Sequence, residues 1–151
     1  VYSWLFGNLN YNATEGLIAT LQDAHWPILV VCNQERVAGR MAPTWADGVL
    51  TVAHHDLEWV REHVEEAKES FQRLARRLNG TAVLLAAGPI ANVMVSVMHA
   101  ANPNNIYLDV GGALDFLING NATREFHPSK EDASNFVRAG GTLMHGQTCT
   151  E

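Results

Sequence analysis

The stretch VLLAAGPIANVMVSVMHAANPNNIYLDVGGALDF, residues 83–116, contains two apolar runs that each end at a glycine-bearing turn. The first turn is Gly88-Pro89, and the second begins at Asp109. Between them, residues 89–101 carry no Asp, Glu, Lys or Arg. Short runs rich in Val, Leu and Ile without polar alternation are typical of strands that are covered on both faces of a parallel sheet. The stretch therefore predicts a strand, a helix and a second strand of an α/β domain.

The same alternation of strand and helix extends over most of the chain. A helix is expected at 13–25, and a longer one at 57–78. Four apolar runs predict strands, at 27–33, 48–53, 81–87 and 105–110. Strands that alternate with helices form parallel sheets through right-handed crossovers. We therefore expect a Rossmann-like, layered α/β domain with a mostly parallel sheet of about four or more strands flanked by helices.

Length and composition fit one globular domain. The chain has 151 residues, a length that suffices for one hydrophobic core but not for two. Its content of 47% hydrophobic and 17% charged residues is typical of a globular protein. Its formal charge of −6 argues against a nucleic-acid partner, because phosphate binding favours basic surfaces. The sequence contains no run of eighteen apolar residues, so it predicts no membrane-spanning segment. Since the chain begins at Val1, we expect a single domain over 1–151 that is a processed product or a fragment, with a partner domain or chain left open.

Three N-x-T sequons begin at Asn12, Asn79 and Asn121, each at an expected loop or element boundary. Such sites accept glycans in secreted proteins. If these sites carry glycans, we expect a glycoprotein of the secretory lumen or the extracellular space. If the sequons occur by chance, a cytoplasmic location is expected.

The long expected helix has an apolar stripe at alternating spacings of three and four residues, formed by Leu57, Val60, Val64, Ala67, Phe71, Leu74 and Leu78. The stripe fits either a coiled-coil seam for a partner or an amphipathic helix that covers its own sheet. Three heptads flanked by strands favour the amphipathic helix.

The helix expected at 89–101 is apolar nearly all round, which predicts burial on most of its sides. Pro89 suits the first helical position, and Asn102-Pro103 should end the helix. His99 is then expected to be a hydrogen-bonded core histidine.

A candidate phosphate site lies where the third strand turns into this helix. Gly88 allows a sharp turn, and the helix beginning at Pro89 would present the backbone N–H groups of Ile90, Ala91 and Asn92. Such a terminus attracts phosphate through hydrogen bonds and the helix dipole. Asn92 adds a side-chain donor. The alternative is a tight turn without a ligand.

A candidate site for ribose or a metal lies at the end of the fourth strand, where Asp109 is also a candidate catalytic residue. Asp109 follows Gly88 by about twenty residues, the distance at which nucleotide-binding folds place an acidic residue on ribose hydroxyls. Gly111 and Gly112 would let a ligand approach the backbone closely. An Asp in an apolar strand is costly unless it is paired, which favours a functional role over the alternative of capping the next turn.

Two residues further along could complete the site. Asp115 could face the same crevice as a metal ligand or as a catalytic general base. Arg124 could bind a phosphate or carboxylate, or could simply be solvated.

Residues 83–127 resemble the second half of GT-D-type glycosyltransferase domains and of related bacterial, algal and algal-viral sugar-transfer domains. The shared features are an apolar strand, a GP turn, a buried helix and a DxG strand end followed by another Asp. The resemblance implies that a nucleotide sugar binds in the crevice as donor and that its sugar passes to a hydroxyl of a glycan or small-molecule acceptor. The positions it implies are Gly88, Pro89, Asp109, Gly111 and Asp115.

In that family an N-terminal acidic DGE-like motif helps to bind a divalent metal, Mn²⁺ or Mg²⁺. The nearest segment here is TEG at 14–16, so the resemblance assigns no metal ligand at that place. A non-catalytic binding or assembly module that keeps the same fold is therefore the alternative.

The segment LDVGGALD, residues 108–115, also resembles the first motif of class I methyltransferases, which would imply S-adenosylmethionine as substrate. That motif normally opens the sheet, whereas here it follows three expected strands. The methyltransferase is the third hypothesis.

Overall fold

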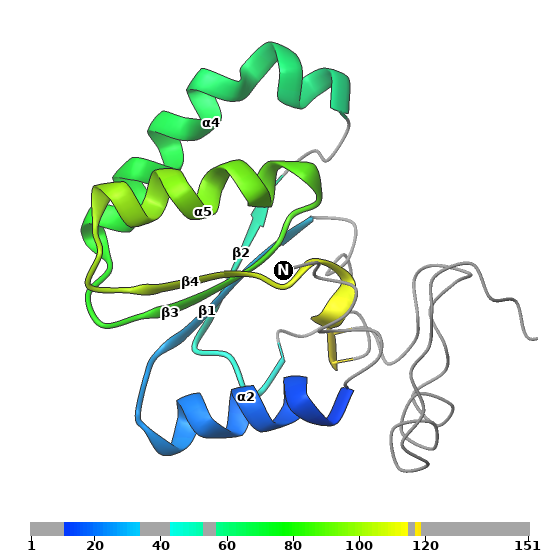
Figure 1. Ribbon diagram of the computed structural model, residues 1–151, viewed down its shortest axis with the longest axis vertical. Coiled ribbons are helices and arrows are strands. Elements are labelled where there is room, and N and C mark those ends of the chain that lie inside the picture. The colour runs from blue at the N-terminus through cyan, green and yellow to red at the C-terminus, as the bar shows by residue number, and fades with distance from the viewer. Residues whose placement is uncertain (1–10, 34–42, 53–56, 115–116, 119–151) are drawn as a thin grey trace, which may run out of the picture.

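Four parallel strands form the sheet of the computed structural model, which describes residues 11–33, 43–52, 57–114 and 117–118 (Figure 1). The strands are β1 (Ile28–Asn33), β2 (Gly48–Val52), β3 (Ala82–Ala86) and β4 (Ile106–Asp109). All four predicted strands are present, with ends within one residue of those expected. The order across the sheet is β2-β1-β3-β4. The prediction of a Rossmann-like, layered α/β fold is confirmed.

Helices cover both faces of the sheet. They are α2 (Tyr11–Asp23), α4 (Leu57–Arg77) and α5 (Pro89–Ala101), with a short 3₁₀ helix, η1 (Gly111–Leu114), after β4. Figure 1 shows α4 and α5 on one side of the sheet and α2 on the other. The connections through α4 and α5 both move across the sheet in the same direction, so right-handed crossovers place them on one face.

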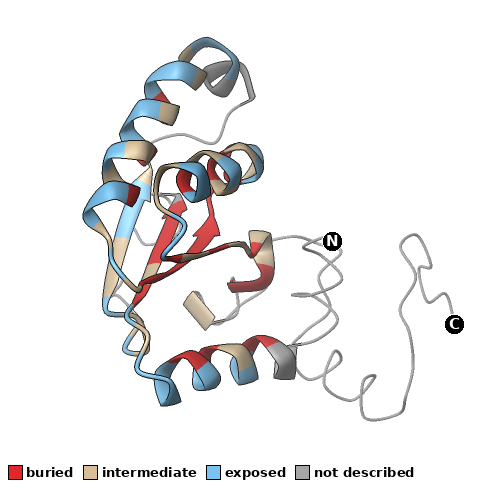
Figure 2. Ribbon diagram, turned by 60° about the vertical axis from the view of Figure 1, so that its left-hand side comes forward, coloured by how far each residue is buried: buried red, intermediate tan, exposed pale blue. Residues whose placement is uncertain are grey.

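The core consists of two apolar layers separated by the sheet. Val83 and Leu85 of β3 pack with α4 and α5, whereas the alternate residues Ala82, Leu84 and Ala86 face the layer of α2 and η1. All five residues of β3 are buried (Figure 2). This two-sided burial explains why the strand is continuously apolar rather than alternating.

The amphipathic interpretation of α4 is confirmed, because the helix packs within its own domain. Ala67, Phe71 and Ala75 are buried in the core layer that α4 shares with α5. The helix bends at His63, whose φ of −117° and ψ of 18° are not helical. From Ala67 to Leu78, the apolar stripe therefore packs in the core.

The expectation that α5 is buried on most sides is wrong. Its buried residues, Ile90, Ala91, Met94 and Met98, lie at helical spacing on one face. Its outer residues Asn92, Ser96, His99 and Ala100 are exposed. Val and Ala side chains on the flanks of α5 raise its apolar content without requiring full burial. No helix in the described part of the chain, α5 included, is long and apolar enough to cross a membrane.

His99 is consequently not a core histidine. Its side chain is exposed, and its ring meets the ring of Tyr107 edge-on at a centroid distance of 6.4 Å. The environment of the His99 side chain is determined by its position on the outer face of the last turn of α5, and not by the apolar residues next to it in the sequence.

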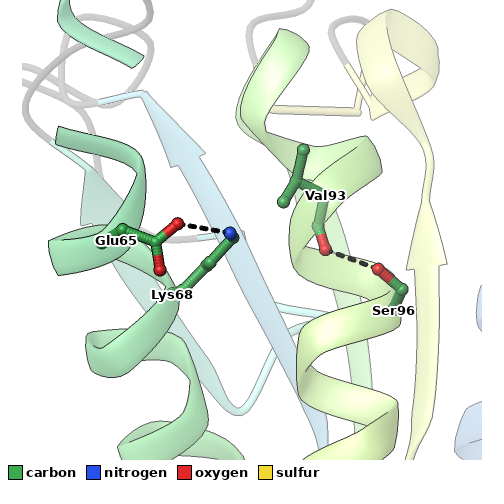
Figure 3. A network of polar contacts seen from close by, with 4 residues as sticks. All are labelled: Glu65, Lys68, Val93 and Ser96. Atoms are coloured by element: carbon green, nitrogen blue, oxygen red, sulfur yellow. Dashed lines mark hydrogen bonds and ion pairs between the residues drawn. The ribbon is translucent and has the colours of Figure 1, made fainter. Parts of the chain in front are cut away.

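Figure 3 shows two polar contacts, one within α4 and one within α5. Lys68 Nζ lies 2.6 Å from Glu65 Oε1, and the Ser96 hydroxyl donates to the Val93 carbonyl at 2.9 Å. Exposed pairs three residues apart contribute about 0.2–0.5 kcal/mol. The two helices are therefore held together mainly by apolar packing and by contacts at their ends.

The predicted end of α5 at Asn102-Pro103 is confirmed, and Asn102 has a second role there. Its side-chain Nδ2 donates to the carbonyl oxygens of Ala75 and Leu78, at 2.9 and 2.7 Å. These carbonyls belong to the carboxyl end of α4, where helical partners run out. One side chain thus ties the ends of both helices together.

A buried polar network lies next to this cap. The Thr81 N–H donates to Asn105 Oδ1 at 2.9 Å, and Asn105 Nδ2 donates to the Tyr107 hydroxyl at 2.9 Å. That hydroxyl in turn donates to the Asn102 carbonyl at 3.0 Å. Because buried polar groups are costly without partners, this chain of bonds fixes where β3 and β4 begin.

Candidate functional site

The carboxyl ends of β3 and β4 lie side by side in the sheet. Leu85 pairs with Asp109, and the N–H of Val110 donates to the Leu85 carbonyl at 2.9 Å. Gly88 follows Leu85 by three residues. The expectation that Gly88 and Asp109 come from neighbouring strands at one edge is confirmed.

Gly88 makes the sharp turn that the sequence predicts. Its φ of 70° and ψ of −149° lie in a region that is open essentially to glycine alone. Pro89 begins α5, and no side chain caps this helix start. The turn therefore depends on glycine, and it leaves the start of α5 without a side-chain acceptor.

Not all of the predicted amide donors at this start are available. The Ala91 N–H donates to the Gly88 carbonyl at 3.0 Å and closes the first turn. The Asn92 side chain is exposed. A phosphate here would rely on the remaining first-turn amides, on Asn92 and on the helix dipole.

Asp109 is a half-buried carboxyl on the face of the sheet that α4 and α5 cover, because its partner Leu85 faces that layer. The Gly111 N–H donates to Asp109 Oδ1 at 3.0 Å. Burial raises the pKa of Asp109 above its ordinary value of 3.8, and the smaller effect of the Gly111 hydrogen bond lowers it. The turn-capping role is thus present, and it coexists with a carboxyl that burial makes a better proton acceptor near neutral pH.

The glycines after Asp109 lead into η1. Gly111 has a φ of 50°, and Gly112 is half-buried in the first turn of η1. Ala113 and Leu114 are buried in the layer of α2, and η1 contacts both β3 and α2. η1 thereby covers the α2 side of the edge at which Gly88 and Asp109 lie.

Asp115 and Arg124 lie outside the described residues, so their predicted roles as base and as anion clamp stay predictions. Within the described ranges, no three His, Cys, Asp or Glu side chains come close enough to hold a metal ion. A divalent metal at Asp109 would need ligands from beyond those ranges.

The strand order adds one feature that the sequence did not indicate. The chain moves from β1 to β2 in one direction and returns to β3 on the other side of β1. Ligands of such sheets bind at this reversal point, between the carboxyl ends of β1 and β3. Gly88 borders the reversal point directly, whereas Asp109 lies one strand further away. The end of β1, at Asn33, therefore borders the same reversal point.

These features define a Rossmann-like α/β domain with a glycine turn and a carboxyl at adjacent strand ends. Comparisons with protein-family models, with curated proteins and with solved structures find no match for the chain.

Proposed function

We propose that the edge formed by the ends of β3 and β4 binds a nucleotide sugar and that the domain transfers the sugar to an acceptor hydroxyl. The observation that carries this proposal is the adjacency of the Gly88 turn and the Asp109 carboxyl on paired strands. A phosphate acceptor at a helix start and an acidic residue on the next strand are the two parts from which such folds build a nucleotide site.

Each part has a distinct role in the proposed reaction. The start of α5 receives the diphosphate, and Asp109 accepts hydrogen bonds from the ribose hydroxyls. The acceptor oxygen attacks the anomeric carbon, the bond from that carbon to the diphosphate oxygen breaks, and the nucleoside diphosphate leaves. Asp115 takes the proton that the acceptor hydroxyl loses. The dipole of α5 stabilises the negative charge on the departing group.

The second candidate function is a binding or assembly module without turnover. The hydrogen bond from the Gly111 N–H to Asp109 favours it, because shaping the turn is a sufficient reason for a carboxyl at this position. A module of this kind would bind a nucleotide or a partner and release no product.

Calorimetry with UDP and GDP, each with and without Mn²⁺, tests the nucleotide site. We expect one nucleotide to bind more tightly than about 1 mM. The 2′-deoxy form of that nucleotide should bind about tenfold more weakly to the parent protein, since a hydrogen bond to a charged group is lost. In Asp109→Ala the two forms should bind equally, because the carboxylate that distinguishes them is gone.

Asp109→Asn keeps an acceptor for the Gly111 N–H and separates loss of charge from loss of the turn. Asp23→Asn, at an exposed position in α2, serves as the matched control. Binding of all nucleotides at millimolar or weaker affinity, unchanged in Asp109→Ala, would rule out the nucleotide site. Tight binding of S-adenosylhomocysteine instead would support the methyltransferase. Nucleotide binding without release of UDP or GDP from the corresponding nucleotide sugars would identify the non-catalytic module.

A further inference from the structure

A depression of about 330 Å³ lies at the amino edge of the sheet, where β1 and β2 begin. This edge is opposite to the one that carries Gly88 and Asp109. The lining comes from the end of α2, from the turn into β1 and from the segment before β2. It combines two indoles with four polar side chains: Trp26, Trp45, Gln22, His25, Thr44 and Asp47. Among the lining side chains that the structure describes, none is Lys or Arg.

His25 takes a backbone conformation that favours glycine. Its φ is 56°, and it is the only non-glycine residue with positive φ in the described ranges. The His25 N–H donates to the Gln22 carbonyl, and the Trp26 N–H donates to the Leu21 carbonyl, both at 2.9 Å. This pair of bonds is the Schellman ending of a helix, in which the left-handed position is usually glycine. A histidine there is strained, and the turn places His25 in the lining of the depression.

Trp45 carries a second unexplained feature. Its indole Nε1 is buried and has no hydrogen-bond partner within the described part of the chain. The indole itself is half-buried and packs beside the α2 layer of the core. A buried donor without an acceptor is rare and costly, and here it belongs to a side chain that lines the depression.

We infer that this depression binds a monosaccharide unit of a glycan. A pyranose has an apolar C–H face that packs on an indole and a rim of hydroxyls that both donate and accept. The hydroxyls match a lining of amide, imidazole, hydroxyl and carboxylate groups. An anionic ligand would meet Asp47 and, among the lining side chains that the structure describes, no Lys or Arg. A cationic ligand would meet Asp47 but would leave the lining donors, such as the Gln22 amide and the Thr44 hydroxyl, without an acceptor.

Asp47 is held in place before any ligand arrives. Its Oδ2 accepts a hydrogen bond of 2.7 Å from the Ile28 N–H, and its own N–H donates to the Ile28 carbonyl at 2.9 Å. These two bonds join the starts of β1 and β2. A carboxylate fixed to the sheet in this way is preorganised to accept from a sugar hydroxyl. The inference does not depend on the nucleotide proposal, because the two sites lie at opposite edges.

Nitrogen-15 NMR of the tryptophan indoles tests the sugar site with glucose, galactose, mannose and N-acetylglucosamine as probes. Trp45→Phe assigns the Trp45 indole signal, and Trp59→Phe, in α4, assigns a control signal. We expect at least one sugar to shift the Trp45 signal saturably and to leave the Trp59 signal in place. Trp26→Ala should weaken that sugar about tenfold, the loss of one aromatic contact.

His25→Gly gives a second, independent readout. It should raise Tm by roughly 2–4 °C, because glycine relieves the left-handed strain, and should weaken sugar binding at the same time. Tetramethylammonium serves as a cationic probe for comparison. The inference is overturned if no sugar shifts the Trp45 signal, or if only tetramethylammonium shifts it. It is also overturned if Trp26→Ala and His25→Gly both bind sugar as tightly as the parent does. UDP affinity should be the same in Trp26→Ala as in the parent, so failure at one edge is distinguishable from failure at the other.

Discussion

The side chain of Asn102 donates a hydrogen bond of 2.7 Å to the carbonyl oxygen of Leu78, which joins the end of α5 to the end of α4. The same nitrogen group reaches the Ala75 carbonyl at 2.9 Å. Asn102 therefore stabilises the layer of the domain that covers Asp109.

Asn102→Ala should lower the free energy of unfolding by about 1–3 kcal/mol, because two helix-end carbonyls lose their donor. Asn102→Asp should destabilise at least as much, since its carboxylate keeps the shape but cannot donate. Chemical denaturation of both variants measures the effect. Asn104→Ala, at an exposed position nearby, is the control and should change stability little. Parent-like stability of Asn102→Asp would show that the bond to Leu78 contributes nothing.

Gly88→Ala should destabilise the domain by about 1–3 kcal/mol, because a φ of 70° with a ψ of −149° is costly for any residue with a Cβ. The change should also weaken any nucleotide bound at the start of α5. Thermal unfolding followed by circular dichroism measures the stability change. A Gly88→Ala variant as stable as the parent would mean that the chain can turn into α5 without glycine.

Gly16→Ala should have the opposite effect and stabilise the domain by about 0.5–1 kcal/mol. Gly16 lies exposed in α2, a Cβ there would meet no atom within 4 Å, and its φ is not positive. The Thr20 hydroxyl, which donates to the Gly16 carbonyl at 2.7 Å, keeps its acceptor. The same unfolding assay therefore compares two Gly-to-Ala changes of opposite sign, and a loss of stability in Gly16→Ala would contradict this account of α2.

The ends of the strands were predictable because each apolar run is bounded by polar or turn-forming residues. The order of the strands was not predictable, since no residue in β1 indicates that β2 and β3 will pair with it on opposite sides. That order places Gly88 at the reversal point and Asp109 one strand beyond it. The arrangement of the candidate site thus depends on the order of the strands in the sheet, which sequence patterns do not reveal.

The environments of single side chains were harder to predict than the elements. The apolar composition of α5 predicted that His99 is buried, yet its side chain lies on the outer face of the helix. Asn102 was recognised as a helix end but not as the cap of α4, because its partners lie 24 and 27 residues earlier in the chain. Such contacts depend on how two helices are docked, and sequence spacing within one helix carries no information about them.

Asp109→Asn should make the domain more stable at neutral pH. Burial raises the pKa of Asp109 in the folded state above 3.8, so the folded protein binds this proton more tightly than the unfolded chain does. At pH values above the folded-state pKa, Asp109 is ionised and its destabilisation of the folded state has its full size. This loss of stability disappears as the pH falls toward 3.8. Tm measured from neutral to acidic pH should show the advantage of Asp109→Asn shrinking over that window, with Asp23→Asn controlling for lost charge. An advantage that grows toward acidic pH would mean that the ionised carboxylate stabilises the fold, as a strong hydrogen bond from Gly111 would require.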